Sequence, residues 1–328
     1  MITTYNVRNG LLVSHEGPPG AAPVLTPEDV VWHDMQAPSL EEERQLEALL
    51  GVEIPTREEM EEIEASSRLY IEAGAFFLTA TVVANAQSET PQLAPVTFIL
   101  SGNRLVTVRY HEPRSFATFR QRAAKIDLGI RSGTTLLIAL FETVTDRLAD
   151  ILEAAARRHE EISRDVFVSG ARSPEQRNQL AQILERIGQA EDMNAKIKES
   201  IATLDRVIGF FSLAPDTKKG ATERRTRIKT VARDLRSLAD YANAQTQKIT
   251  FLLDATLGMI NIEQNSIIKI FSVAAVVFLP PTLIASIYGM NFHVMPEIGF
   301  TFGYPMALGM MVLSAVGPYF FFKRKGWL

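Results

Sequence analysis

Two long stretches without a charged residue constrain the fold of this chain most strongly. Residues 270–287 and residues 300–322 contain no Asp, Glu, Lys or Arg. A helix needs about 20 apolar residues to cross the hydrocarbon core of a bilayer, so the second stretch is long enough and the first lies near the lower limit. The intervening residues 288–299 are too few to form a domain. We therefore predict a membrane hairpin with a short connecting loop.

The basic residues predict how this hairpin is oriented. Lys269 precedes the first stretch, and Lys323, Arg324 and Lys325 follow the second, whereas the loop contains neither Lys nor Arg. Cytoplasmic flanks carry an excess of Lys and Arg, so both termini are predicted to be cytoplasmic and the loop external. The start of the chain lacks the basic-then-apolar pattern of a secretory signal. We expect a multi-pass protein of the cell (inner) membrane.

Composition excludes several classes of function. The chain has no cysteine and a formal net charge of -4, so thiolate catalysis and Cys-ligated zinc are excluded. No basic patch interleaved with aromatic residues suggests a nucleic-acid partner. We find no catalytic triad, phosphate loop or cluster of metal ligands, and we expect neither an enzyme nor an organic cofactor.

Residues 1–130 read as a cytoplasmic domain of the α+β class, with helices covering a sheet. Ser39 and Glu42 form a capping-box pattern, which predicts a helix that ends at Gly51. The residues 101–103 predict a hairpin turn. Strands are predicted at 30–34, 76–83, 96–100 and 105–110, and further helices at 56–68 and 115–125.

Beyond residue 132 the strand patterns disappear and helical spacing takes over. Residues 131–220 predict an antiparallel pair of long helices, the second beginning at Ser173-Pro174-Glu175-Gln176. Residues 221–290 predict one stalk helix that continues into the first membrane span. Its apolar positions alternate spacings of three and four, as in a coiled-coil seam. The seam comprises Ile228, Val231, Leu235, Leu238, Ala242, Gln245, Ile249 and Leu252.

A second stripe runs along the same helix into the membrane. It has no formal charge beyond Asp254, and many of its residues are small or bear an amide. Such a face suits either close helix packing or the wall of a pore, and the residues alone leave both open. One hairpin cannot enclose a pore, so the second reading requires an oligomer. The stripe comprises Asp254, Gly258, Asn261, Asn265, Ile268, Ser272, Ala275, Leu279, Thr282, Ser286 and Gly289.

The segment from Tyr288 to Phe292, with the following Met295-Pro296-Glu297 and Phe302-Gly303-Tyr304-Pro305, resembles the CorA family of magnesium and cobalt transporters. Gly289-Met290-Asn291 at the outer end of the first span matches the signature of that family. The likeness extends through residues 261–265, Pro280-Pro281, the region of Trp32 and Asp34, and residues 140–142.

The resemblance implies a funnel-shaped homopentamer whose first membrane helices line a pore. It also implies passive transport of divalent cations (Mg²⁺, with Co²⁺ and Ni²⁺), gated by intracellular Mg²⁺. Residues 291–299 would form the external loop, residues 300–322 the outer membrane helix and residues 323–328 a basic cytoplasmic tail. Pro280 and Pro281 are expected to kink the first span.

The resemblance also assigns residues to the ion pathway. Gly289, Met290 and Asn291 would form the selectivity filter, where the Asn291 amides hydrogen-bond the waters that Mg²⁺ releases reluctantly. An apolar constriction below the filter would block ions by dewetting. The pore and gate residues would be Asn265, Ile268, Phe271, Ala275, Leu279 and Thr282.

Charged residues complete the predicted site. Asp254 matches a polar position on the cytoplasmic side of the pore. Asp234 of the stalk, with Glu58 or Glu59 of the acidic helix, would bind regulatory Mg²⁺ between subunits, although an ungapped alignment places Thr230 at the stalk position instead. In the external loop His293 replaces a residue that is commonly acidic in the family, and Glu297 is the only formal charge between residues 270 and 322.

Two other functions remain open. A zinc transporter of the same superfamily usually alters the Met of the triplet and the loop after it, and both are intact here. A membrane-tethered coiled-coil scaffold would explain the long helix and the basic tail. It gives no reason for Gly289-Met290-Asn291.

Overall fold

The computed structural model describes residues 1–15, 30–88, 90–168, 176–213, 220–291, 293 and 295–327. Its contacts divide the chain into two compact units, Met1–Leu252 and Leu253–Leu328. Helix α7 (Ala221–Tyr288) contributes to both units.

A mixed seven-stranded sheet forms the centre of the first unit. Its strand order is β2-β1-β3-β7-β6-β5-β4. The pair β3–β7 is parallel, and the other neighbours are antiparallel. The strands are β1 (Ile2–Arg8), β2 (Leu11–His15), β3 (Val30–Gln36), β4 (Leu69–Glu72), β5 (Ala75–Ala84), β6 (Gln92–Ser101) and β7 (Arg104–Arg109).

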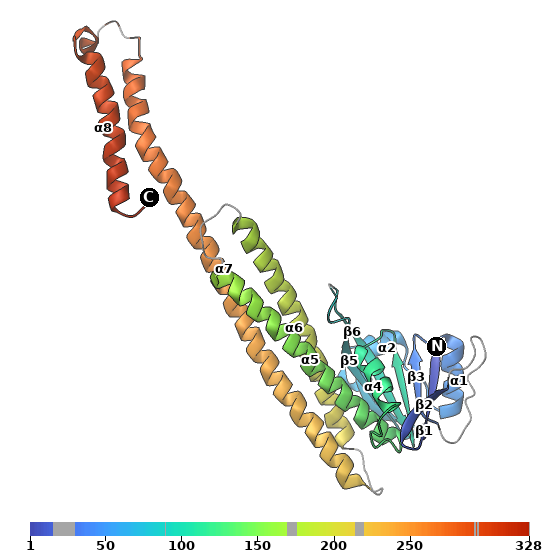
Figure 1. Ribbon diagram of the computed structural model, residues 1–328. Helices are drawn as coiled ribbons and strands as arrows, with labels where there is room; N and C mark the ends of the chain where they lie inside the picture. Colours follow the sequence, from blue (N-terminus) through green and yellow to red (C-terminus); the bar gives the residue numbers. More distant parts are fainter. Residues whose placement is uncertain are drawn as a thin grey trace. The chain divides into compact units, whose positions relative to one another are not determined.

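Helices cover both faces of this sheet, because successive strand residues point to opposite faces and both sets are apolar. One core joins the sheet to α4 (Arg114–Ala123), α5 (Gly133–Val168) and α6 (Gln176–Ser212), with Trp32 and Phe98 at its centre. The other core joins the opposite face to α1 (Leu40–Leu50) and α2 (Arg57–Glu61). Figure 1 shows α4 against the sheet and the long helices extending away from it. The predicted α+β class is confirmed.

Most local predictions for this unit are also confirmed. The Ser39 capping box forms, and Gly51 ends α1 in the left-handed conformation with φ of 70°. The β6–β7 hairpin turns at Gly102 and Asn103, because Ser101 pairs with Arg104. The strands β1, β2 and β4 were not predicted.

The single helix predicted at 56–68 is wrong. The chain leaves α2 at Glu62, whose backbone is extended with ψ of 143°. A separate short helix, α3, follows at Ala65–Arg68. The Glu62 carbonyl accepts a hydrogen bond from Arg68 Nε, so a side chain supplies the donor that a continuing helix would have given.

The three long helices pack along the predicted seam. Val231, Leu235, Ala242 and Ile249 of α7 are buried, and the first three belong to the same core as α5 and α6. Polar contacts reinforce the packing, since Asn194 Nδ2 of α6 donates to the Ala242 carbonyl at 3.1 Å. The predicted start of α6 at residues 173–175 lies outside the described residues.

The second unit contains the predicted hairpin. Helix α7 continues through Pro280 and Pro281 to Tyr288. A 3-10 turn, η1 (Pro296–Gly299), precedes α8 (Gly303–Arg324). Both helices are long and apolar enough to cross a membrane, and α8 begins three residues later than the predicted span.

Candidate functional site

Helix α8 covers one face of α7 within the second unit. Figure 1 shows α8 alongside the last part of α7, and Lys269 Nζ lies 5.9 Å from the centroid of the Trp327 ring that follows α8. Val273 of α7 is 3% exposed, and Val277, Ile284 and Tyr288 are half-buried. These positions are separated by four, seven and four residues, which places them on one face of a helix.

The predicted pore residues occupy the opposite face. At 3.6 residues per turn, positions 275 and 279 lie about half a turn away from 273 and 277. Ile268, Phe271 and Leu279 are 61%, 71% and 66% exposed, and Asn265, Ala275 and Thr282 are exposed as well. We call this set the free face of α7. None of the described residues packs over this face closely enough to bury it.

The C-terminal end of α7 narrows to a tighter turn before the chain enters the loop. Gly289 N donates to the Ala285 carbonyl at 2.9 Å, and Met290 N donates to the Ile287 carbonyl at 3.3 Å. A Cβ at position 289 would lie 3.1 Å from the Ala285 carbonyl oxygen, which is closer than ordinary contact. A side chain there would therefore press on the last turn of the helix.

Asn291 follows this turn and is exposed. Its amide makes no hydrogen bond with the described part of the chain, so both polar atoms are free to meet water. His293 is also exposed, and Glu297 lies in η1. On the free face, the Thr282 hydroxyl donates to the Phe278 carbonyl at 2.7 Å, which leaves its oxygen lone pairs available as acceptors.

The structure does not bring the predicted regulatory carboxylates together within one chain. Glu59 is used in the α2 capping box, where it accepts from Thr56 N at 2.7 Å. Asp234 Oδ1 lies 3.7 Å from Nε of the neighbouring Arg233. Burial is the main cause that raises the pKa of Asp146 of α5, and the charges of Glu142, Asp150 and Asp234 act in the same direction. The described residues contain no cluster of three His, Asp or Glu that could hold a metal. Asp254 is exposed on α7.

The architecture defines a membrane hairpin joined to an α+β unit through a long helix. The sequence model of one family, described as CorA-like Mg²⁺ transporter protein, matches residues 27–324. The chain therefore belongs to the CorA family, which is a family of transporters, and α7 and α8 contain its transmembrane helices.

Curated relatives agree with this assignment over nearly the whole chain. The magnesium transport protein CorA of Pasteurella multocida is 39% identical over 298 residues, covering 91% of this chain and 92% of that protein. The protein of the same name from Salmonella typhimurium is 36% identical over 300 residues, covering 92% of each.

Solved structures share the fold at low sequence identity. The CorA magnesium transporter of Methanocaldococcus jannaschii has a TM-score of 0.76 and 19% identity, covering 100% of this chain and 99% of that chain. The full-length CmaX protein has a TM-score of 0.67 and 14% identity, covering 99% and 97%. The cytoplasmic domain of ZntB from Vibrio parahaemolyticus has a TM-score of 0.56 and 12% identity, covering 79% and 97%.

Proposed function

We propose that this chain forms a homopentameric channel for Mg²⁺, with the free face of α7 lining the pore. The observation that carries the proposal is the position of this face, opposite α8 and leading to Gly289, Met290 and Asn291. The curated relatives named for magnesium transport cover the same segments. Packing of α8 on the other face leaves this face of α7 exposed, so it can meet an axis shared by several copies.

The proposed filter suits a strongly hydrated ion. Mg²⁺ dehydrates reluctantly and usually keeps several waters. A ring of Asn291 amide oxygens can accept hydrogen bonds from those waters without replacing them. Neutral oxygens also avoid holding a divalent cation so tightly that it cannot leave, which conduction requires.

The proposed gate lies below the filter. Leu279 and Ile268 place large apolar side chains on the free face. Several copies around one axis would form a narrow constriction that excludes ions by dewetting. Thr282 lies between this constriction and the filter.

Regulation by intracellular Mg²⁺ requires a site between subunits, because the carboxylates are dispersed in one chain. Asp234 with Glu58 or Glu59 is our candidate, and Asp254 faces the same pathway nearer the membrane. A bound cation would relieve the repulsion between carboxylates and hold neighbouring subunits together.

In this proposal both termini are in the cytoplasm, the membrane is the inner membrane, and Co²⁺ and Ni²⁺ are also carried. No catalytic role is assigned.

The absence of cysteine from the chain gives a direct test of the proposed pore face. Single cysteines at Ala275, on the free face, and at Val277, on the face toward α8, can be compared after mild oxidation of the membrane-embedded protein. We expect disulfide-linked dimers for Ala275→Cys and none for Val277→Cys. Equal cross-linking of the two variants would contradict a shared axis along the free face.

A further inference from the structure

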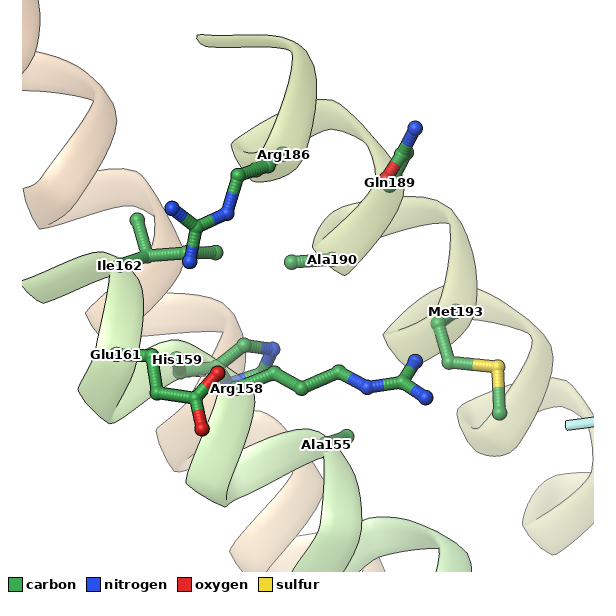
Figure 2. A pocket seen from close by; sticks show the side chains of 9 residues that line it. All are labelled: Ala155, Arg158, His159, Glu161, Ile162, Arg186, Gln189, Ala190 and Met193. Carbon is green, nitrogen blue, oxygen red and sulfur yellow. The ribbon is translucent and has the colours of Figure 1, made fainter. Parts of the chain in front are cut away.

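Two groups of basic side chains outside the proposed ion pathway differ in how they are arranged. One borders a hollow of about 210 Å³ between α5 and α6, drawn in Figure 2. There Arg158 and Arg186 point to different sides, and Arg186 is already paired with Asp165. The hollow therefore presents no convergent positive charge. The other group lies at one end of the membrane hairpin.

At this end of the hairpin, positive charge adjoins both membrane helices. One basic residue directly precedes the uncharged part of α7, and three directly follow the uncharged part of α8. We call these four residues the basic cluster: Lys269, Lys323, Arg324 and Lys325. All four are exposed, and none forms a salt bridge within the described part of the chain. From residue 264 to residue 327 the only acidic side chain is Glu297, which lies in the loop at the opposite end of the hairpin.

A defined turn fixes the chain that follows α8. Gly326 has a φ of 70°, the left-handed conformation in which many helices end. Its N donates to the Lys323 carbonyl at 3.2 Å, and Trp327 N donates to the Phe322 carbonyl at 3.1 Å. The Trp327 and Phe322 rings stack with their centroids 5.3 Å apart. These hydrogen bonds and this apolar contact form a Schellman motif, so the chain folds back onto α8.

The folded-back indole ring meets α7. Lys269 Nζ lies 5.9 Å from the centroid of the Trp327 ring. Lys269 precedes the buried Val273 by four residues, so it lies on the α8 side of α7 and not on the free face. The cluster is therefore built from both helices and is separate from the proposed pore.

Aromatic rings also lie beside the other two lysines of the cluster. Lys323 Nζ is 5.9 Å from the centroid of the Tyr319 ring, and Lys325 Nζ is 5.6 Å from that of the Phe321 ring. A cation is attracted to the face of an aromatic ring, and Tyr and Trp favour the interface between membrane and water. These contacts hold the cations at the depth of the lipid headgroups.

We propose that the basic cluster, together with Trp327, is an interaction surface for anionic phospholipid headgroups. Lysine and arginine side chains donate to phosphate oxygens, and each such residue near an anionic membrane surface adds to the attraction. A zwitterionic headgroup also offers a phosphate, but the cluster repels its ammonium group. The surface should therefore select phosphatidylglycerol over phosphatidylcholine.

Trp327 can report this preference by fluorescence. The chain has two tryptophans, and Trp32 is completely buried in the first unit, so only Trp327 meets lipid. The full-length protein is placed in vesicles of mixed phosphatidylcholine and phosphatidylglycerol, with bromine on the acyl chains of one lipid or the other. Bromine quenches a nearby indole, so the ratio of the two quenching values gives the preference. We expect phosphatidylglycerol to be enriched beside Trp327 relative to its share of the vesicle.

Removing single charges tests the cluster. Lys269→Gln and Arg324→Gln should each lower the preference about 5-fold, since one basic residue near an anionic surface has this value. Lys229→Gln is the matched control, because Lys229 is an exposed lysine of the same helix that lies in the first unit. Raising salt from about 0.1 M to about 1 M shortens the Debye length from about 10 Å to about 3 Å, which should weaken the preference in the parent.

Equal quenching by the two brominated lipids in the parent would overturn the proposal. An equal loss of preference in Lys229→Gln, or no loss in either cluster variant, would overturn it as well. If a variant does not assemble, the salt dependence of the parent decides, since a preference that high salt leaves unchanged is not electrostatic. The measurement reads lipid contact and not ion movement, so its failure is distinct from failure of the proposed channel.

Discussion

Asp34 has an environment that few carboxylates occupy. It is 2% exposed, and Arg109 beside it is completely buried. Its oxygens accept from Arg109 Nη2 at 2.8 Å, Thr107 Oγ1 at 2.8 Å and Arg120 Nη1 at 3.0 Å. This network ties β3 to β7 and to α4. The residue therefore links two strands and a helix of the first unit.

Removing the Asp34 carboxylate should be costly, because Arg109 would remain buried without its partner. We expect Asp34→Ala to lower the free energy of unfolding by about 3–5 kcal/mol. Glu61→Ala, which removes the exposed Arg57–Glu61 pair, should cost no more than about 0.5 kcal/mol. Chemical denaturation of both variants checks this, and similar losses would show that the buried pair contributes little.

His33 predicts a pH dependence of stability. It is fully buried, and neither ring nitrogen has a partner among the described residues. Burial, followed by the charge of Arg104, lowers the pKa of His33 to about 4. At these pH values the folded protein therefore binds fewer protons than the unfolded chain. The contribution of the neutral His33 to stability is fully present above the unfolded pKa of about 6.5 and is lost as pH falls toward 4.

The expected loss for His33 is about 3 kcal/mol across that interval. His111 and His159, whose pKa values burial also lowers, act in the same direction. Melting temperatures of the parent, His33→Gln and the exposed-site control His15→Gln should be compared between pH 7.5 and 4.5. The dependence should flatten only in His33→Gln. An unchanged profile in that variant would mean that other groups control acid unfolding.

At the scale of elements, two isoleucines of α7 offer a matched comparison. Ile268 and Ile270 are 61% and 57% exposed in the chain, yet only Ile268 lies on the free face. If that face lines the pore, Ile268→Ser hydrates the constriction, and Leu279→Ser should act similarly. We expect increased basal ion leak from Ile268→Ser and Leu279→Ser vesicles and none from Ile270→Ser. Leak from all three, or from none, would place the gate elsewhere.

The elements that sequence patterns predicted are those whose signals are local. The helices α5, α6 and α7 follow from apolar spacing, and α1 follows from its capping box and Gly51. Strand β1 escaped prediction because Thr3, Thr4 and Asn6 are buried polar residues that hide the alternating pattern. The break at Glu62 also escaped, since neither Gly nor Pro marks it.

Sequence patterns likewise predicted only part of the candidate site. Periodicity along α7 located the free face, and the resemblance supplied the meaning of Gly289-Met290-Asn291. No sequence pattern could reveal that Asn194 of α6 hydrogen-bonds to the Ala242 carbonyl of α7, because this contact depends on how two distant helices pack. The same limit applies to Asp34 and Arg109, which meet only when β3 pairs with β7.

At the scale of the whole molecule, the central claim is that Mg²⁺ crosses the membrane past Asn291. A membrane potential of 100 mV, negative inside, favours entry of a divalent cation by roughly 5 kcal/mol. Liposomes containing the purified protein and a Mg²⁺-sensitive dye can therefore report influx after such a potential is imposed. Assembly of each variant should first be checked by its elution volume.

Initial Mg²⁺ influx in the parent and in Asn291→Ala, against protein-free liposomes, is the most direct test. We predict rapid, potential-dependent influx in the parent. In Asn291→Ala we predict influx no greater than in empty liposomes, although the variant assembles normally. Parent influx equal to that of empty liposomes would contradict the proposed function, and undiminished influx through Asn291→Ala would contradict the filter.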